Sequence, residues 1–500
     1  MTMKTKHLPW YKKLSVIITI SLLPLGLLSG TSCTFLSHSD STYTPKVIND
    51  GTGGAIAVYE EVKSSNERDF YAQRISPDGK TLWSDKGTLI GSSQSASYSF
   101  PVFDIAGDGT GGAIIGWPDL SPNQSQSTKH VTKIDSNGNI LWRSDFAYFD
   151  QLISDGAGGA ILAFDHPAGA NTINNNDIPF VVTRIDSHGN YSWGQQGVTI
   201  QRRSYWSNSL EIISDDTNGV IAVWEEMESQ PGGTTPNFQT TCRIMAQRVD
   251  ARGTLPWGTS GITLRTNPAN VSMEEPNAAA DGFGGAIVSW HQYPSGPMDS
   301  SSPEWVMQDI CTQKIDSNGN ILWPPNSVPL QIVKTAERAS PHTPLVVSDV
   351  TGGAIIMWED LRNGLASIYA QKMDANGTTG WQTGGVKVCY MKSNSSFVWR
   401  QIAGDGSGGA VISCCFKEAG TGNQGILVQK LDAAGKNVWP NDGVVVTGGT
   451  TTRYFLASDG QGGALVGWGN NNGSSEKSYL QKVGANGKSL WGAAGIKLGE

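Results

Sequence analysis

Eight basic residues recur at equivalent positions along the chain, and a ring of such charges could bind an anion. In six of the eight repeats an aspartate follows two residues later, as with Lys314 and Asp316. Residues two apart on a strand share a face, so we expect local charge pairing instead of an anion site. The eight are Arg74, Lys133, Arg184, Arg248, Lys314, Lys372, Lys430 and Lys482.

Repeated Asp and Asn residues in turn-like segments raise the question of calcium. Residues 135–139 and 316–320 both read Asp-Ser-Asn-Gly-Asn. Calcium takes six to eight oxygen ligands, whereas each segment offers about one carboxylate and an amide. We therefore interpret them as turns and predict no metal and no cofactor.

Aromatic residues outside the repeat pattern are the candidate binding residues. Tyr205 and Trp206 follow Arg202 and Arg203 in one connecting segment, and Tyr293 and Trp305 lie in another. Exposed aromatic rings beside polar groups suit a glycan or a peptide. Alternatively, the four rings only cover the rim of their own loops.

Two sequence blocks alternate eight times and must position all of these residues. One block resembles residues 314–323, Lys-Ile-Asp-Ser-Asn-Gly-Asn-Ile-Leu-Trp, and always closes on tryptophan. The other resembles residues 281–290, with Asp-Gly-x-Gly-Gly-Ala before an apolar run. The tryptophans are Trp83, Trp142, Trp193, Trp257, Trp323, Trp381, Trp439 and Trp491. Spacings of 47 to 68 residues between successive aspartates suit one small antiparallel sheet per repeat.

Each repeat offers four extended pieces, which we name strands A to D. Asp-Gly-x-Gly-Gly between A and B, and Asn-Gly between C and D, are strong hairpin signals. Units that need neighbours to bury their faces form one closed body. We predict an all-β fold: an eight-bladed β-propeller of four-stranded antiparallel blades over residues 44–500, with strand D running through the tryptophan.

The parity of the strands separates two ends of this propeller. The A–B and C–D turns lie at one end, are short, and differ little between repeats. The B–C and D–A connections lie at the other end and vary widely, with long B–C segments at 165–178, 226–241 and 291–309. Binding residues concentrate in such loops, so we place the candidate site at that end.

Glycine followed four residues later by tryptophan, in eight copies, resembles bacterial cell-surface β-propeller repeats. It is more distantly similar to the tryptophan-docked blades of eight-bladed quinoprotein propellers. The resemblance implies a fold but no particular activity, because propellers of this kind include binding lipoproteins, scaffolds and dehydrogenases.

Two details bear on enzymatic alternatives. The quinoprotein resemblance draws attention to Cys414-Cys415, since those dehydrogenases use a vicinal disulfide. Adjacent strand residues point to opposite faces, so we predict buried free thiols. Residues 78–83 resemble the Asp-box turn of sialidases, but no grouped arginines or paired acids accompany them in the sequence.

The N-terminus predicts export. Lys4, Lys6, Lys12 and Lys13 precede an apolar run at 14–28, and small residues then lead to Cys33, as in a lipoprotein signal. An ordinary signal peptide, with Cys33 incidental, is the alternative. We divide the chain into a leader at 1–32, a polar tether at 33–43 and the propeller.

Charge and cysteine content exclude some classes of function. Loss of residues 1–32 leaves 32 basic against 44 acidic residues, a formal charge of −12, which disfavours nucleic-acid binding. Five cysteines remain after Cys33, without the spacing of a zinc site. We interpret the chain as an exported, lipid-anchored module of the cell envelope that binds a surface protein or glycan and is not an enzyme. The alternative is a propeller enzyme, either a quinoprotein-like dehydrogenase or a glycan-cleaving hydrolase.

Overall fold

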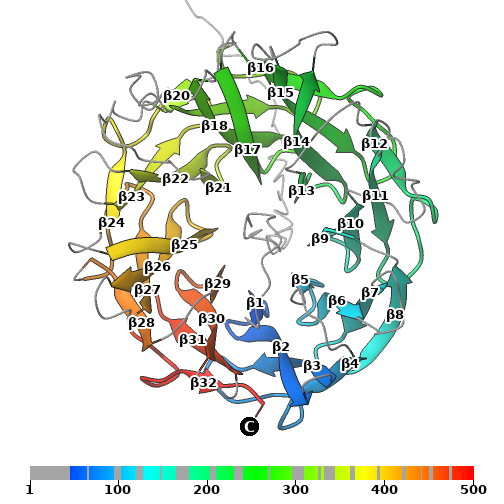
Figure 1. Ribbon diagram of the computed structural model, residues 1–500, viewed down its shortest axis with the longest axis vertical. Helices are drawn as coiled ribbons and strands as arrows, with labels where there is room; N and C mark the ends of the chain where they lie inside the picture. The colour runs from blue at the N-terminus through cyan, green and yellow to red at the C-terminus, as the bar shows by residue number, and fades with distance from the viewer. Residues whose placement is uncertain are drawn as a thin grey trace, which may run out of the picture.

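The structure, a computed structural model, forms a closed ring of eight four-stranded antiparallel sheets (Figure 1). It describes residues 45–64, 67–94, 103–119, 128–146, 149–164, 179–202, 210–229, 240–267, 271–294, 309–324, 328–330, 344–360, 366–390, 395–418, 424–440, 442–449, 454–471 and 476–499. Over these residues there is no helix, and hence none long and apolar enough to span a membrane. The prediction of an all-β, eight-bladed propeller is confirmed.

Each blade is built from four consecutive strands of the chain. Blades 1 and 2 are β1(Lys46–Asn49), β2(Ala55–Ser64), β3(Glu67–Ile75), β4(Thr88–Gln94), and β5(Asp104–Gly107), β6(Ala113–Asp119), β7(Thr128–Ile134), β8(Ile140–Phe146). Blades 3 and 4 are β9(Gln151–Ser154), β10(Ala160–Phe164), β11(Pro179–Ile185), β12(Val198–Arg202), and β13(Glu211–Ser214), β14(Val220–Ser229), β15(Thr240–Val249), β16(Ile262–Thr266). Blades 5 and 6 are β17(Val271–Ala280), β18(Ala286–Pro294), β19(Asp309–Ile315), β20(Val328–Leu330), and β21(Leu345–Ser348), β22(Ala354–Asp360), β23(Ser367–Met373), β24(Val386–Tyr390). Blades 7 and 8 are β25(Ser395–Gly404), β26(Ala410–Glu418), β27(Gln424–Leu431), β28(Val444–Gly449), and β29(Tyr454–Ser458), β30(Ala464–Asn471), β31(Glu476–Val483), β32(Ile496–Lys497).

Strand D differs from the expectation. In most blades it does not run through the tryptophan: one isolated bridge, such as Ile315 to Ile321, follows the C–D turn, and the fourth strand begins only later. Blade 2 is the exception, because β8 includes Trp142. The fourth strand still pairs with strand C of its own blade, as β24 does with β23. The bend leaves the tryptophan side chain free to reach the neighbouring blade.

The A–B turn is held by its leading aspartate. Asp50 Oδ1 accepts hydrogen bonds from the backbone N–H groups of Thr52, at 2.9 Å, and Gly54, at 2.8 Å. Gly51 and Gly53 have φ values of 77° and 89°, which a side chain would strain. The interpretation of these segments as hairpin turns is confirmed.

The closing tryptophan docks every blade onto the next one. In all eight blades its indole N–H donates to a backbone carbonyl in the C–D turn of the following blade, at 2.9–3.2 Å. The acceptors are Ser136, Ser187, Ala251, Ser317, Ala375, Ala433, Ala485 and Pro77. The last contact, from Trp491 to Pro77, closes the ring between blades 8 and 1.

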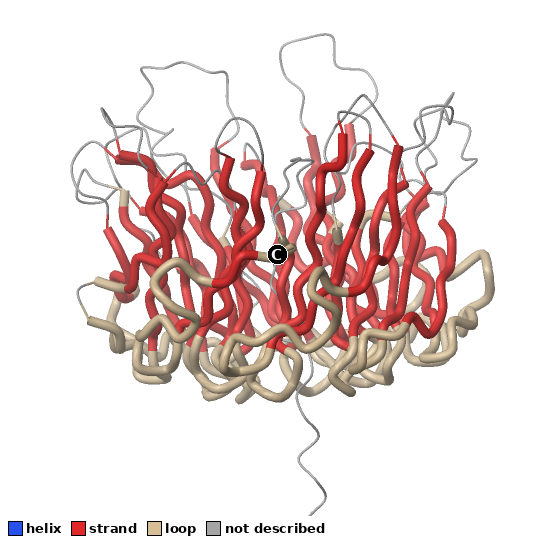
Figure 2. The backbone as a smooth tube through the Cα atoms, turned by 90° about the horizontal axis from the view of Figure 1, so that it is seen from below, coloured by secondary structure: helices blue, strands red, loops and turns tan. Residues whose placement is uncertain are grey.

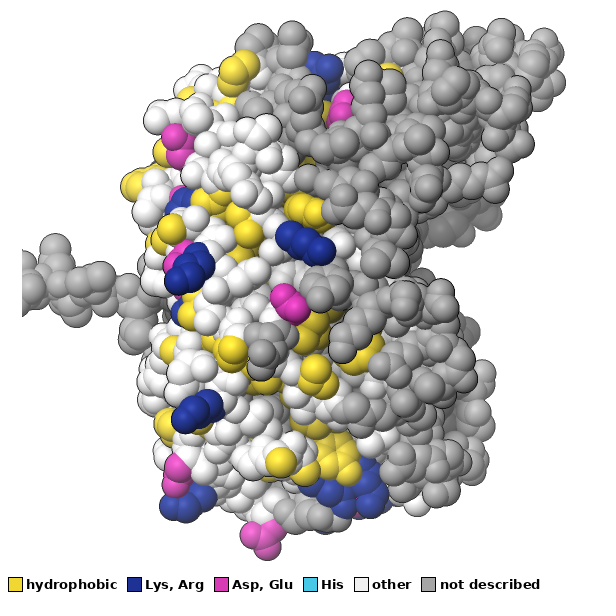
Figure 3. All heavy atoms as spheres, turned by 90° about the vertical axis from the view of Figure 1, so that its left-hand side faces the viewer, with side chains coloured by type: hydrophobic (Ala, Val, Ile, Leu, Met, Phe, Trp, Pro, Cys, Tyr) yellow, Lys and Arg dark blue, Asp and Glu magenta, His cyan; other side chains and the backbone are white. Residues whose placement is uncertain are grey.

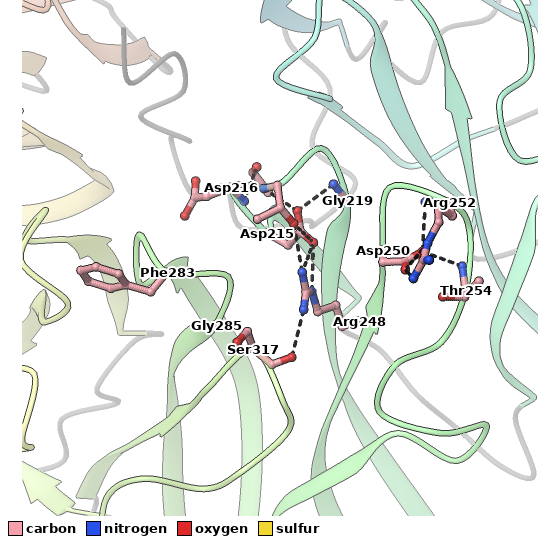
Figure 4. A network of polar contacts seen from close by, with 12 residues as sticks. Asp215, Asp216, Gly219, Arg248, Asp250, Arg252, Thr254, Phe283, Gly285 and Ser317 are labelled. Carbon is pink, nitrogen blue, oxygen red and sulfur yellow. Dashed lines mark hydrogen bonds and ion pairs between the residues drawn. The ribbon is translucent and has the colours of Figure 1, made fainter. Parts of the chain in front are cut away.

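The recurrent basic residue of strand C makes a second link between blades. Arg248 pairs with Asp215 of its own A–B turn at 2.8 Å and donates to the Ser317 carbonyl of blade 5 at 2.9 Å (Figure 4). The basic residues of strand C therefore form ion pairs, but the prediction that they pair with the aspartate two residues later was wrong. Asp316, two residues after Lys314, instead accepts N–H groups of its own C–D turn, and Lys314 pairs with Asp281.

The two ends of the ring differ as the strand parity predicts. Figure 2 shows the A–B and C–D turns gathered along one edge of the ring, below the strands. We call this edge the turn face and the opposite edge the loop face. On the side of the ring seen in Figure 3, charged side chains occur in small separate groups among apolar ones. That side, where it is described, presents no continuous band of charge.

Replacing Trp323 by Ala should lower the free energy of unfolding by about 3–5 kcal/mol, because it removes a large ring from a packed interface. The side chain is only 3% exposed and lies between blades 5 and 6. Leu322→Ala is the matched control, since Leu322 is 49% exposed and should cost about 0.5 kcal/mol or less. Urea unfolding of both variants would test this, and equal losses would contradict the docking role.

Candidate functional site

Two inner strands extend further toward the loop face than the others. β17 and β25 have ten residues each, whereas the remaining inner strands have four or five. Figure 1 shows both as long arrows at the inner side of their blades. The extensions carry Glu274 and Glu275 on β17 and Arg400 on β25.

A bulge interrupts β17 at this extension. Glu274 lies opposite His291 and Asn277 opposite Ser289, so Glu275 and Pro276 together face the single residue Trp290. Glu275 has a φ of 55°, which is unusual for a residue with a side chain. Bulges redirect side chains, and strained backbone of this kind concentrates at functional sites.

Glu225 of β14 lies under this bulge. Its neighbour Trp224 packs among residues of blade 3, so Glu225 faces the other way, toward blade 5. Only 2% of Glu225 is exposed. Its carboxyl accepts a hydrogen bond from the backbone N–H of Glu275, and the Cys242 sulfur lies 3.8 Å from its Oε1.

The surroundings of Glu225 favour its protonated form. Burial and the negative charges of Glu274 and Glu275 raise the pKa of Glu225 to about 8, against the opposing effect of the Glu275 N–H group and the nearby Cys242 thiol. Burial, followed by the charge of Glu225, also raises the pKa of the Cys242 thiol to about 12. Glu225 therefore keeps its proton at neutral pH, while Cys242 remains an unreactive thiol that donates to the Met273 carbonyl at 3.0 Å.

Arg400 lies on the opposite long strand and is already paired. It forms an ion pair with Glu359, at the end of β22 in the intervening blade. Burial lowers the pKa of Arg400, and the negative charges of Glu359 and Glu275 act in the opposite direction. Glu275 and Arg400 thus lie on the extensions of the two long inner strands, which belong to the blades on either side of blade 6.

We call Glu225, Glu274, Glu275 and Arg400, with Glu359, the carboxylate cluster. It combines one carboxyl group that holds its proton with others beside it, the arrangement that general acid–base chemistry requires. The part of the chain that the structure describes holds no group of three or more His, Cys, Asp or Glu side chains arranged to bind a metal.

The aromatic residues predicted from the sequence are not tested. Tyr205, Trp206 and Trp305 lie outside the described residues, as does Cys33. Tyr293 falls in β18, two residues after His291, and only its backbone is described. They remain predictions, and Tyr293 belongs to the strand that pairs with the bulge.

Sequence reasoning missed the carboxylate cluster for a specific reason. Glu274 and Glu275 precede the repeated block at residues 281–290 and lie on an extension that most inner strands lack. Glu225 and Glu274 are 49 residues apart and come from different repeats, so no local spacing relates them. Glu-Glu dipeptides occur at 60–61, 225–226 and 274–275, so this pattern alone would not have singled out the site.

The chain resembles several solved propellers at low identity. One is a polysaccharide lyase family 25 ulvan lyase bound to -[GlcA(1-4)Rha3S]-, with 11% identity, a TM-score of 0.41, and coverage of 91% of this chain and 97% of the other. Another is polysaccharide lyase Uly1, with 9% identity, a TM-score of 0.40, and coverage of 75% and 88%. A third is a family 117 glycoside hydrolase from the marine bacterium Zobellia galactanivorans, with 10% identity, a TM-score of 0.27, and coverage of 55% and 82%. No protein-family model and no curated protein sequence matches the chain.

The prediction of a non-catalytic module is corrected. Most of these solved structures are lyases and glycosidases, although a eukaryotic initiation factor is among them. They do not include quinoproteins in particular. At such identities the likeness speaks for the fold alone.

The raised pKa of Glu225 predicts how stability depends on pH. The native protein holds a proton that the unfolded chain loses near pH 4.5, so the free energy of unfolding should fall as the pH rises from about 5 to about 8. Glu225→Gln mimics the protonated carboxyl and should flatten that fall. Melting temperatures of both proteins between pH 5 and 9 would show it, and parallel curves would contradict the assignment.

Proposed function

We propose that this protein is a glycan-cleaving enzyme whose active site is the carboxylate cluster on the loop face. Glu225 supplies the proton to the leaving oxygen, and the half-buried Glu274 and Glu275 provide the carboxylate that acts as base or nucleophile. The observation that carries this proposal is the placement of a buried carboxyl group directly beneath two others on a strained bulge.

Glycosidic bond cleavage requires this combination of groups. Most glycosidases use two carboxyl groups, one protonated to assist departure of the leaving sugar and one ionised to activate water or to attack the sugar. A buried acid beside negative charges keeps its proton at neutral pH, which suits the first role. The connections between strands B and C vary in length and sequence from repeat to repeat, which suits the selection of a substrate.

The charge of the cluster indicates the class of glycan. Glu274 and Glu275 lie beside Glu225, and the guanidinium of Arg400 is already paired with Glu359. An anionic sugar would meet net repulsion there, because like charges at short range are unfavourable. We therefore propose a neutral or amino-sugar polysaccharide as the substrate.

Cleavage of a panel of neutral, amino-sugar and uronate polysaccharides, measured by new reducing ends, tests the proposal. Glu225→Gln should lower kcat by about 10²–10⁴-fold, the usual contribution of a general acid. Glu226→Gln is the matched control, because Glu226 is the next residue, is partly exposed and pairs with Arg243 at 3.2 Å. It should retain activity.

Two results would overturn the assignment. Full activity in Glu225→Gln would remove Glu225 from the chemistry, and no cleavage of any polysaccharide by the wild-type protein would remove the enzymatic proposal. Products bearing an unsaturated sugar would instead show elimination, in which the cluster acts as a base on a uronate.

We also propose that the protein is exported and attached to a membrane of the cell envelope through a lipid on Cys33. The support is the N-terminal pattern of lysines, apolar residues and small residues before that cysteine. An enzyme held at the surface by a tether would meet polymeric glycans or surface proteins outside the cell.

Cys33→Ser should move the protein from the membrane fraction to the soluble fraction, because a lipid chain contributes about 0.8 kcal/mol for each buried methylene group. Detergent partitioning and fractionation of cells expressing each form measure this. Cys242→Ser, which changes a buried thiol of the propeller, serves as the control and should fractionate like the wild type. Unchanged fractionation of the Cys33 variant would contradict the anchor.

A further inference from the structure

Two buried cysteines from different blades lie in direct contact. Cys389 belongs to β24, the outer strand of blade 6, and Cys414 belongs to β26 of blade 7. Their sulfur atoms are 3.4 Å apart, and the two residues are 3% and 0% exposed. Sequence reasoning compared Cys414 only with its neighbour Cys415, whose side chain packs instead among residues of blades 7 and 8.

We infer that Cys389 and Cys414 form a disulfide bond that joins blade 6 to blade 7 when the protein folds in an oxidising compartment. A disulfide has an S–S distance of about 2.05 Å, so the two sulfur atoms have about 1.3 Å left to close. The inference does not depend on the proposed glycan-cleaving activity.

The other described cysteines have different surroundings. Cys242 donates to the Met273 carbonyl at 3.0 Å, and the sulfur of Cys311 lies 3.6 Å from Gln292 Oε1. Cys415 follows Cys414 on the same strand and points to the opposite face. Among the residues that the structure describes, Cys389 and Cys414 thus form the one pair whose sulfur atoms are shown in contact.

The reaction is a two-electron oxidation. Both thiols lose their protons, a bond forms between the two sulfur atoms, and two electrons and two protons reduce the disulfide of a thiol–disulfide oxidant to two thiols. Disulfides form in the compartments that exported proteins enter, and the N-terminal sequence predicts export. The oxidant is thus of the thiol–disulfide class, and it acts in the compartment that the exported protein enters.

Burial determines when the bond forms. The attacking species in disulfide exchange is a thiolate, and burial raises the pKa of Cys414 well above its ordinary value. The packed interface around the pair, which includes Ile368, Val388 and Ile402, also excludes an oxidant. Oxidation should thus precede the packing of blade 7 against blade 6, and the folded dithiol should react slowly.

Refolding the full chain with oxidised and reduced glutathione, or with dithiothreitol, tests the inference. Remaining thiols are blocked with N-ethylmaleimide in denaturant, and the digested protein is analysed by mass spectrometry. We expect the Cys389 and Cys414 peptides to be joined in the glutathione arm, with Cys415 blocked, and no joined peptides in the dithiothreitol arm. Complete blocking of Cys389 in the glutathione arm, or its linkage to another cysteine, would overturn the inference.

Melting temperatures give a second measurement with a matched control. The wild-type protein and Cys415→Ala should melt several degrees higher after oxidative refolding than after reductive refolding, because a cross-link restricts the unfolded chain. Cys389→Ala should show no difference between the two conditions. An equal difference in Cys389→Ala would show that another bond is responsible, and the peptide analysis of the wild-type protein stands even if a variant fails to fold.

Discussion

The hydrogen bond from a tryptophan indole to a carbonyl of the next blade is the contact on which the ring depends. It recurs at all eight blade interfaces, including the one that closes the ring. It also explains the glycine of each C–D turn. A Cβ atom at Gly377, whose φ is 82°, would lie 2.8 Å from the Trp323 ring, so that position needs glycine both for its backbone angle and for the close approach. The tryptophan of one repeat and the glycine of the next therefore form a single contact between two blades.

The fold could be predicted from the sequence because every repeat contains this tryptophan and this glycine. Turn chemistry and alternating apolar residues are local signals, and eight copies made their register visible. Contacts between residues far apart in the sequence were harder to predict. The ion-pair partner of Lys314 was expected to be Asp316, two residues away. It is Asp281, which lies 33 residues earlier in the A–B turn of the same blade. Both aspartates accept backbone N–H groups of their own turns, but Asp281 also faces Lys314 through its second carboxylate oxygen, whereas that oxygen of Asp316 accepts from the Asn320 side chain.

The candidate site escaped prediction because it departs from the repeat. The A–B and C–D turns serve the ring in every blade, so their residues have little freedom to vary. At the loop face, two inner strands lengthen, and one of them accepts a bulge with Glu275 at positive φ. Such strain persists only where the surroundings hold it, and here the blades on both sides are already fixed by their tryptophans. A rigid ring can thus support an irregular segment at one point of its edge.

Buried carboxyl groups in this protein separate into two kinds, and the difference lies in their donors. Burial alone would raise the pKa of Asp349, but Thr351, Gly353 and Lys372 donate to it, and its pKa falls below the ordinary value. Glu225 is also buried, yet it meets one backbone N–H donor, a distant thiol and two negative charges, so its pKa rises to about 8. Burying a carboxyl group that has few hydrogen-bond donors costs free energy, and an apolar residue would pack at that position at lower cost. Glu211 is buried as well, and its pKa is raised well above the ordinary value although Asn277 and Ala278 donate to its carboxyl group, so a retained proton alone does not mark a chemical role. Glu225 differs from Glu211 because two further carboxyl groups, those of Glu274 and Glu275, lie beside it at the bulge.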